Sequence, residues 1–532
     1  MQHPQDCTLT GALSIWAAAH PDKTWLQDST GDAVTVAQGY LRSKKFSSFL
    51  HQLGMQPEDR VGVFMFNSCA MVATVFGIGY LRATAVMLNT ELRSAFLLHQ
   101  LNDCELSAIV VDASLVEHIV SLSAELPHLK TLIVLGDLTV DVPEQWQTQV
   151  WSNSQACEPW EGDEPQPHDI FCIMYTSGTT GPSKGVLMPH CHCALLGLGT
   201  IRSLEVIEDD KYYICLPLFH ANGLFMQLGA TVLAGIPAFL KRRFSASTWL
   251  ADIRETGATL TNHLGTTASF VMNQPASPHD KQHRLRASMN APNPAQHEAV
   301  FRERFGITDV VSGFGMTEVG IPIWGKIGHS VPNAAGWVHE DRFEACIAHP
   351  ETDIPVPAGE VGEILIRPKV PFGFMAGYLN VPEKTVEAWR NLWFHTGDAG
   401  TMDEGGLITF VDRIKDCIRR RGENISATEV EAVVGQLPGI YEVAAYAVPA
   451  DGAGAEDEVM LAVVLDEGVA LDAADIVNKA SSMLPRFAKP RFVRVLDSLP
   501  KTATGKIQRT VLRQQGSAGA YDAESTSAKG NG

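Results

Sequence analysis

The chain has 532 residues, enough for several domains, and its 45% hydrophobic and 19% charged residues are typical of a folded globular protein. Its formal net charge of −19 argues against general nucleic-acid binding, because phosphate backbones are held by clustered Lys and Arg. We expect no secretory signal and no membrane span, since the longest apolar run, residues 71–81, is too short to cross a bilayer. Ten scattered cysteines indicate reduced thiols and a cytoplasmic protein.

Strand-like and helix-like apolar patterns alternate through roughly the first 410 residues. This alternation predicts parallel sheets with helices on both faces. We therefore predict an α/β fold, with a large N-terminal domain of stacked α/β sheets over residues 1–412. Helices are expected at residues 68–81 and 91–101, and strands at 60–65, 84–88, 107–111, 132–135, 171–174, 212–216, 238–240 and 309–311.

The pattern changes near Asp412, where a polar and basic segment begins. We predict a small α+β domain at residues 413–515, a common domain size. The last stretch, residues 516–532, is small and polar without an apolar period, which predicts a flexible tail. Within the small domain, helices are expected at residues 427–434 and 473–483, and strands at 440–448 and 458–464.

Residues 175–185, Tyr-Thr-Ser-Gly-Thr-Thr-Gly-Pro-Ser-Lys-Gly, follow an apolar strand and precede a helix-like stretch. A triphosphate is held by backbone N–H groups, hydroxyls and a positive charge, and glycines let the backbone approach closely. This segment supplies all three, with Lys184 as the charge. It lacks the Gly-Lys-Ser/Thr order of a Walker A loop, which excludes the ordinary P-loop kinases and ATPases. The alternative is a flexible surface loop without a ligand.

Residues 190–193, His-Cys-His-Cys, invite a metal hypothesis. Adjacent ligands cannot all face one ion on a regular element, and no CxxC cluster follows. We favour buried side chains at the start of a helix.

The loop resembles the signature loop of the adenylate-forming superfamily, which comprises acyl-CoA synthetases, peptide-synthetase adenylation domains and luciferases. The resemblance continues in the family's order through residues 313–318 (Gly-Phe-Gly-Met-Thr-Glu), 394–398 (Phe-His-Thr-Gly-Asp), 412–415 (Asp-Arg-Ile-Lys) and 500–506 (Pro-Lys-Thr-Ala-Thr-Gly-Lys). It implies a ligase that uses ATP and Mg²⁺ to activate a carboxylic acid as an acyl-adenylate, releases pyrophosphate and passes the acyl group to coenzyme A.

The resemblance also assigns roles to single residues. It implies that Lys506, Glu318 and His220 are catalytic and that Glu318 and Thr176 hold Mg²⁺. Lys415 matches the hinge about which the small domain rotates as a lid, and Gly422 matches the CoA tunnel. Phe314 stands where the family commonly has Tyr, and keeps a face for adenine. The expected ATP and AMP contacts are Thr176, Ser177, Gly178, Thr179, Thr180, Gly181, Lys184, Phe314, Gly315, Thr317, Asp398 and Arg413.

The acyl pocket is expected at His220, Asn290 and Gly313. Relatives carry Ser-Gly-Gly-Ala-Pro-like residues where this chain has Asn290 and Ala291, so its pocket is expected to be narrower or more polar. Residues 281–286 and 301–306 look similar to bacterial carnitine/crotonobetaine-CoA ligases, which suggests a small or medium acid, with a carnitine-like acid as a candidate. Phe219-His220 replaces the Asp of amino-acid-activating domains.

Other readings stay open at this point. The acceptor is free CoA or a carrier protein; residues 241–243 and 419–421 are basic runs that could meet CoA phosphates or simply face solvent. A non-catalytic nucleotide-binding relative and a luciferase-type oxygenase are the remaining alternatives. The expected partner is a small carboxylic acid, with no nucleic acid, and we allow for a homodimer.

Overall fold

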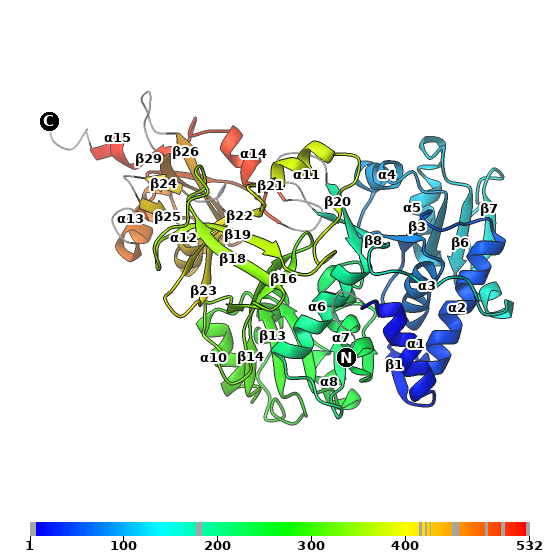
Figure 1. The fold of residues 1–532 in the computed structure, drawn as a ribbon. Helices are drawn as coiled ribbons and strands as arrows, with labels where there is room; N and C mark the ends of the chain where they lie inside the picture. Colours follow the sequence, from blue (N-terminus) through cyan, green and yellow to red (C-terminus); the bar gives the residue numbers. More distant parts are fainter. Residues whose placement is uncertain are drawn as a thin grey trace.

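The computed structural model describes residues 7–176, 183–413, 418–420, 423–425, 427–449, 457–484, 488–501 and 506–527. In Figure 1 the elements coloured orange and red gather at one side of a larger body coloured blue to yellow. The fold is the predicted α/β class, with a large N-terminal part and a small C-terminal part.

The first large sheet contains the strands predicted in the first third of the chain. Its central strands run parallel and are buried along their whole length, as expected for a sheet covered on both faces. In order across the sheet they are β20 (Gly377–Tyr378), β9 (Lys184–Pro189), β8 (Ile170–Thr176), β4 (Thr84–Met87), β3 (Arg60–Phe64), β5 (Ala108–Asp112), β6 (Thr131–Leu135) and β7 (Gln147–Val150).

One prediction in this sheet is wrong. Residues 184–189 form a strand, β9, that pairs antiparallel with β8, where a helix-like stretch was expected after the loop. Lys184 therefore lies at the start of a strand, and the helix begins only at His190. The glycine-rich loop closes a hairpin, whereas the loop of a Walker A protein leads into a helix.

The second large sheet is also mainly parallel, with β2 antiparallel at its edge. One hydrophobic core contains residues of both sheets and of the helices α6 and α7, so these helices lie in a layer shared by the sheets. The strand order is β14 (Asp309–Val311), β13 (Ala287–Ala291), β12 (Leu260–Leu264), β10 (Tyr212–Ile214), β11 (Ala238–Leu240), β1 (Thr24–Asp28) and β2 (Ala33–Thr35).

Helices cover these sheets, and α3 shows why one of them starts where it does: the Ser68 hydroxyl accepts a hydrogen bond from the amide of Met71. The helices of this part are α1 (Leu9–Ala19), α2 (Val36–Gln52), α3 (Cys69–Tyr80), α4 (Ser94–Asp103), α5 (Val116–Val120), α6 (His190–Ser203), α7 (Gly229–Ala234), α8 (Trp249–Thr256), α9 (Gly265–Met272) and α10 (Ala295–Glu303), with a π-helix, η5 (Asn222–Leu228), and the 3₁₀ turns η2 (Ala113–Leu115), η3 (Ser123–Glu125) and η4 (Trp151–Ala156).

Two smaller antiparallel sheets follow and carry two of the sequence motifs. Residues 313–318 lie on β15 and the turn after it, and residues 394–398 lie on β22. The first sheet contains β15 (Gly313–Met316), β16 (Gly320–Trp324) and β17 (Trp337–Val338). The second contains β18 (Phe343–Ala348), β19 (Gly362–Pro368), β21 (Trp389–Arg390), β22 (Trp393–Met402) and β23 (Ile408–Arg413). The helix α11 (Pro382–Ala388) lies between β19 and β21 in the sequence.

The C-terminal part has two hydrophobic clusters made only of residues from Ile418 onward. The predicted helix at 473–483 and the helix at 427–434 are both confirmed. Its elements are β24 (Ile418–Arg420), β25 (Glu423–Ile425), α12 (Ala427–Val434), β26 (Ile440–Pro449), β27 (Asp457–Leu465), α13 (Ala473–Met483), β28 (Phe492–Val495), α14 (Arg509–Gln514), β29 (Tyr521–Asp522) and α15 (Ala523–Ser527).

The structure differs from the predicted flexible tail over residues 516–527. Strand β29 pairs with β28, and the Arg494 guanidinium donates to the backbone oxygens of Gly516 and Ala518. Arg491 also binds the Asp522 carboxylate. Because these residues are held by polar contacts, their sequence shows no apolar repeat from which the order could be predicted.

The His-Cys-His-Cys run lies in the first turn of α6, and all four side chains are buried, as predicted. Among the described residues, the one group of metal-ligand side chains that lie within reach of each other is Asp28, Asp32 and Cys69. Across the same residues, no helix combines the length and the apolar character that crossing a membrane requires.

Two buried histidines predict how stability depends on pH. Burial lowers the pKa of His190 and of His263 to about 3 in the folded chain. The unfolded chain therefore binds more protons than the folded chain below the usual histidine pKa of about 6.5, and stability falls as pH drops from there toward 3. Each histidine should contribute up to about 1.4 kcal/mol per pH unit to this loss.

We expect His263→Gln to flatten the dependence of unfolding free energy on pH between about pH 6.5 and about pH 4, measured by denaturant titrations. His279→Gln, at an exposed position, is the control and should leave the slope unchanged. An unaltered slope in the His263 variant would contradict the prediction.

Candidate active site

The glycine-rich loop is held at both ends by α4. The Tyr175 hydroxyl donates to the Asp103 carboxylate at 2.6 Å, before the loop. After the loop, a ring nitrogen of His99 lies 2.9 Å from the backbone oxygen of Ser183. The hairpin register places Thr176 opposite Lys184. The predicted contacts Ser177, Gly178, Thr179, Thr180 and Gly181 lie outside the described residues.

A buried carboxylate, that of Glu318, lies next to the hairpin. The side chain is 4% exposed and accepts hydrogen bonds from the Tyr378 hydroxyl at 2.9 Å and the Thr176 hydroxyl at 3.4 Å. A carboxylate with two hydroxyls offers the hard oxygen ligands that Mg²⁺ prefers. The structure thus brings together the two residues predicted to hold the metal, and the donor set fits it.

Tyr378 is a site residue that the sequence analysis missed. Its ring lies 4.0 Å from the Lys184 ammonium, in cation–π geometry, and its hydroxyl reaches Glu318. Burial raises the pKa of Tyr378, so the phenol stays protonated and donates. The residue comes from β20, which pairs with β9 across a long chain separation, and nothing in the local sequence indicates that pairing.

The Glu318 backbone is also fixed in place. Its carbonyl oxygen accepts from the amide of Met375, and a ring nitrogen of His192 lies 2.9 Å from the Thr317 carbonyl oxygen. The other ring nitrogen of His192 lies 2.9 Å from the Gly373 carbonyl oxygen. His192 therefore joins the 313–318 motif to the segment that leads to Tyr378.

The predicted adenine contact, Phe314, is buried and stacks on Phe410 with ring centroids 6.0 Å apart. Gly315 has no room for a side chain, because a Cβ there would collide with the backbone oxygen of Gly320. Gly313 pairs with Trp324 across β15 and β16. These three residues are consecutive in β15.

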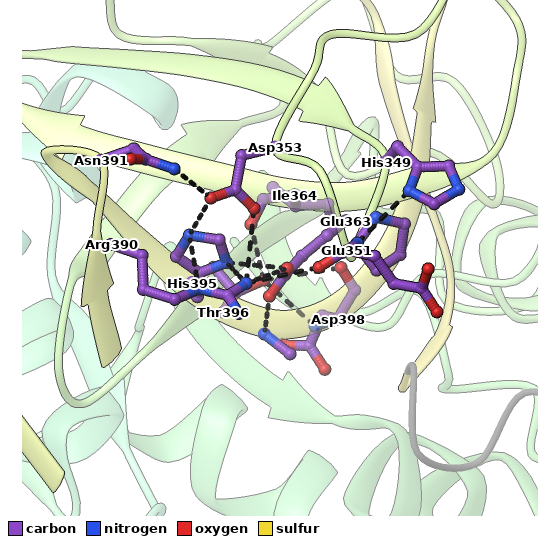
Figure 2. A network of polar contacts seen from close by, with 12 residues as sticks. His349, Glu351, Asp353, Glu363, Ile364, Arg390, Asn391, His395, Thr396 and Asp398 are labelled. Atoms are coloured by element: carbon purple, nitrogen blue, oxygen red, sulfur yellow. Dashed lines mark hydrogen bonds and ion pairs between the residues drawn. The ribbon is translucent and has the colours of Figure 1, made fainter. Parts of the chain in front are cut away.

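The Thr396-Gly397-Asp398 turn is held by hydrogen bonds on two sides (Figure 2). The Thr396 hydroxyl donates to the Ile364 carbonyl and accepts from the Asp398 amide at 3.1 Å. The Gly397 amide donates to the Glu363 carboxylate at 2.9 Å. Asp398 is buried, and its backbone pairs with that of Arg413.

Beneath this turn lies a charged network that the sequence analysis did not identify. His395, with a side chain 7% exposed, lies between the carboxylates of Glu363 and Asp353, at 2.9 Å and 3.6 Å (Figure 2). Arg390 reaches the same two carboxylates. Buried charges are tolerated when they are paired in this way, and Glu363 links the network directly to the turn that carries Asp398.

The charge of Lys506 acts on His220, although 286 positions separate the two residues in the chain (506 minus 220). The His220 side chain is exposed, yet protein surrounds it closely enough that desolvation, with the positive charge of Lys506, lowers its pKa to about 4. At neutral pH the imidazole is thus uncharged and suited to shape a gate more than to donate a proton. Lys506 itself is exposed.

Several predicted residues are not brought into the site. Lys415 and Gly422 lie outside the described residues, as does the Arg413 side chain. Asn290, expected at the acyl pocket, lies in register with His263, whose ring packs against Trp249 and Phe301 on the α8–α10 side of the sheet. Alternate strand residues face opposite ways. Its neighbour Met289 therefore faces η5 instead.

The basic run at 241–243 is largely paired. The Lys241 ammonium lies 2.8 Å from the Asp252 carboxylate, and the Arg242 guanidinium lies 2.9 Å from that of Asp112. Arg243 is exposed and stacks on Phe66. In the second run, Arg420 pairs with Glu458 at 2.6 Å. Among the described side chains of the two runs, Arg243 is the exposed one, with its guanidinium 4.0 Å from the Glu91 carboxylate.

Comparison with known proteins gives a consistent result. Residues 13–379 match the AMP-binding enzyme family, and residues 429–506 match the AMP-binding enzyme C-terminal domain. The chain is 28% identical to long-chain fatty acid transport protein 1 of Mus musculus, over 94% of this chain and 81% of the relative. It is also 28% identical to the crotonobetaine/carnitine–CoA ligase of Salmonella paratyphi A, over 88% of this chain and 90% of the relative.

Two solved structures show the same fold. The anthranilate CoA ligase AuaEII in complex with anthranoyl-AMP has a TM-score of 0.83 and 25% identity, covering 96% of this chain and 98% of that one. O-succinylbenzoate coenzyme A synthetase (MenE) of Bacillus subtilis, in complex with ATP and magnesium ion, has a TM-score of 0.78 and 25% identity, covering 94% and 98%.

The contact between Glu363 and Gly397 yields a test of how the Asp398 turn is held. Glu363→Leu leaves the half-buried Gly397 amide without its charged acceptor, and loss of a hydrogen bond to a charged group costs about 1.5–3 kcal/mol. We expect amide hydrogen exchange in the peptide containing residues 394–400 to become about tenfold faster or more. Glu363→Gln retains an oxygen acceptor and should preserve most of the protection.

The control is Glu344→Leu on β18 of the same sheet, whose carboxylate is half-exposed and pairs with Arg367. It should leave exchange in this peptide unchanged. Equal exchange rates for the two leucine variants would contradict the role given to Glu363.

Proposed function

The chain belongs to the AMP-binding enzyme family, and from this premise we propose that it is an ATP-dependent acid–thiol ligase. It is an enzyme of the AMP-forming acyl-CoA ligase family. In the proposed reaction a carboxylate attacks the α-phosphorus of ATP and expels pyrophosphate, and the acyl group of the adenylate then passes to the thiol of coenzyme A. The observation that carries the proposal is the buried Glu318 carboxylate, which accepts from the Thr176 and Tyr378 hydroxyls beside the Lys184 ammonium.

Adenylation joins two anions, so the site must neutralise charge in the transition state. Glu318, with Thr176, would hold Mg²⁺, which would supply positive charge to offset the charge of the phosphates. Lys184 and the loop of Ser177, Gly178, Thr179, Thr180 and Gly181 would bind the phosphates. Lys184, fixed over the Tyr378 ring, brings its charge to the end of the loop.

The nucleoside would lie between the 313–318 motif and the Asp398 turn. Asp398 would accept hydrogen bonds from both ribose hydroxyls, for which a carboxylate is a natural partner. Phe314, Gly315 and Thr317 would border the adenine, with Arg413 on the ribose or phosphate side. Support comes from the fixed backbone at both places.

Lys506 would place its ammonium between the carboxylate and α-phosphate oxygens during adenylation. Neutral His220 would form the gate beside the acyl group, with Gly313 on the pocket wall. In the thiol step the small domain would rotate about Lys415, and Gly422 would line the path of the CoA thiol. Arg243 is the basic residue best exposed to meet a CoA phosphate.

For the acid we propose a small or medium carboxylic acid, with a carnitine-like acid as one candidate; the crotonobetaine/carnitine–CoA ligase relative supports this size class. We place the enzyme in the cytoplasm, since all nine described cysteines are free thiols.

A pyrophosphate-release screen tests the function. Carboxylic acids of varied length and polarity are supplied with MgATP, with and without CoA, and a phosphopantetheinyl carrier protein replaces CoA in a third arm. We expect acid-dependent release of pyrophosphate, and CoA-dependent formation of an acyl thioester. Thioester formation with the carrier protein alone would contradict CoA as acceptor, and ATP turnover without any acid would contradict the ligase.

Lys506→Ala tests the lysine. Loss of a positive charge at the developing transition state should lower the rate of acyl-adenylate formation at least about a hundredfold. Thiolation of supplied acyl-adenylate should be spared, as the lysine acts in the first step. Lys479→Ala, an exposed lysine on α13 of the same domain, is the control. Pyrophosphate release near the wild-type rate in the Lys506 variant would remove the assignment.

Tyr378→Phe removes the hydroxyl that donates to Glu318 and keeps the ring beneath Lys184. Loss of one hydrogen bond to a charged group, about 1.5–3 kcal/mol, should raise the Mg²⁺ concentration required for half-maximal activity about tenfold or more. Tyr378→Leu should add a loss of ATP affinity. The control is Tyr446→Phe, since the buried Tyr446 hydroxyl has no partner among the described residues; identical Mg²⁺ curves for the two Phe variants would refute the prediction.

A further inference from the structure

A π-helix begins two residues after His220. In η5 the backbone winds more widely than in an α-helix, so residues five apart lie on one face, and Gln227 Nε2 donates to Asn222 Oδ1 at 3.1 Å. π-helical turns are rare and occur frequently at functional sites. This π-helix continues directly into the α-helix α7.

The same Asn222 oxygen joins a wider network. Asn262 Nδ2 on β12 donates to it at 2.9 Å, and the Tyr212 hydroxyl on β10 donates to Asn262 Oδ1 at 2.7 Å. In this arrangement Asn222 Oδ1 accepts two hydrogen bonds, and Gln227 presents its nitrogen to it. The Gln227 oxygen is thereby turned away from Asn222.

That oxygen has no hydrogen-bond partner among the described residues, although Gln227 is fully buried. Buried polar atoms are almost always paired, and an exception calls for an absent water or ligand group. Asn222 is only half-buried and lies at the start of the π-helix, two residues after His220. Its amide nitrogen is a second group that can donate.

Apolar residues bound the network. Met289, which faces the same side of the sheet as Asn262, is buried in the core that also contains Leu224 and Phe225 of η5. The amide network therefore lies among buried apolar residues.

We propose that Gln227 and Asn222 recognise a neutral hydrogen-bonding substituent, a hydroxyl or a carboxamide, on the acyl part of a short acid. This inference rests on the proposed function, which puts the acyl group beside His220. The Gln227 oxygen accepts a hydrogen bond from the substituent, and the Asn222 amide nitrogen donates a hydrogen bond to the oxygen of the substituent. No side chain of the network carries a formal charge, so a neutral group is preferred over an ammonium or a second carboxylate.

The test compares acids that differ by one hydroxyl. The full chain is supplied with MgATP and either 3-hydroxybutanoate or butanoate, and either carnitine or γ-butyrobetaine; short ω-hydroxy acids are paired with unsubstituted acids of the same length, and hexadecanoate represents long chains. We expect kcat/KM for pyrophosphate release to be at least about tenfold higher for the hydroxy acid in the best pair. Unsubstituted acids, γ-butyrobetaine or hexadecanoate as the best substrate would overturn the inference.

Variants then locate the preference. Gln227→Leu removes the unpaired oxygen and should bring the two acids of the best pair to within a few-fold of each other, with KM for ATP unchanged. Asn222→Ala, a separate variant at the half-buried position, should reduce the ratio of the two acids in the same way. The control is Thr261→Val on β12, whose side chain faces away from the network and donates to Tyr213; it should retain the wild-type ratio.

The results separate this inference from the proposed function. Acid-dependent pyrophosphate release without a hydroxyl preference, or a preference that survives both Gln227→Leu and Asn222→Ala, would leave the ligase standing and refute the recognition. No release with any acid would overturn both.

Discussion

The site depends on one buried negative charge, the carboxylate of Glu318. A carboxylate cannot be buried without partners, and here it has the hydroxyls of Thr176 and Tyr378, from residues 142 and 60 positions away in the chain. Satisfying it therefore brings the end of β8, the 313–318 turn and β20 to one place. Lys184 then lies over the Tyr378 ring, at the start of the strand that pairs with β8.

Two further devices complete the surroundings of that charge. Glu363 accepts a hydrogen bond from the Gly397 amide and pairs with His395, so that residues 396–398 of β22 are also held by a buried polar network. Desolvation, with the positive charge of Lys506 from the small domain, lowers the pKa of His220 and keeps its ring neutral. The described residues thus combine the negative charge of Glu318, the positive charges of Lys184 and Lys506 and a neutral imidazole, a set that suits the proposed reaction of two anions.

The sequence predicted the fold class and most strands, because fully buried parallel strands are continuous apolar runs, such as residues 108–112 on β5. Thr176, Glu318, His220 and Lys506 could be nominated as site residues because glycine-rich and charged motifs are local. The sequence did not indicate what depends on pairing at a distance: the strand at 184–189, the contacts of Tyr378, and the arginine anchors of residues 516–527. The face of β13 on which Asn290 lies, in register with His263, also could not be predicted, since composition does not reveal the phase of a strand.

The central claim is that the carboxylate attacks the α-phosphorus of ATP in this site. It is tested most directly by turnover of a carboxylic acid substrate labelled with ¹⁸O in its carboxyl group, followed by mass spectrometry of the nucleotide product. Attack at the α-phosphorus predicts AMP that carries one ¹⁸O from the acid after the acyl group has been transferred. Unlabelled AMP, or formation of ADP in its place, would contradict the account.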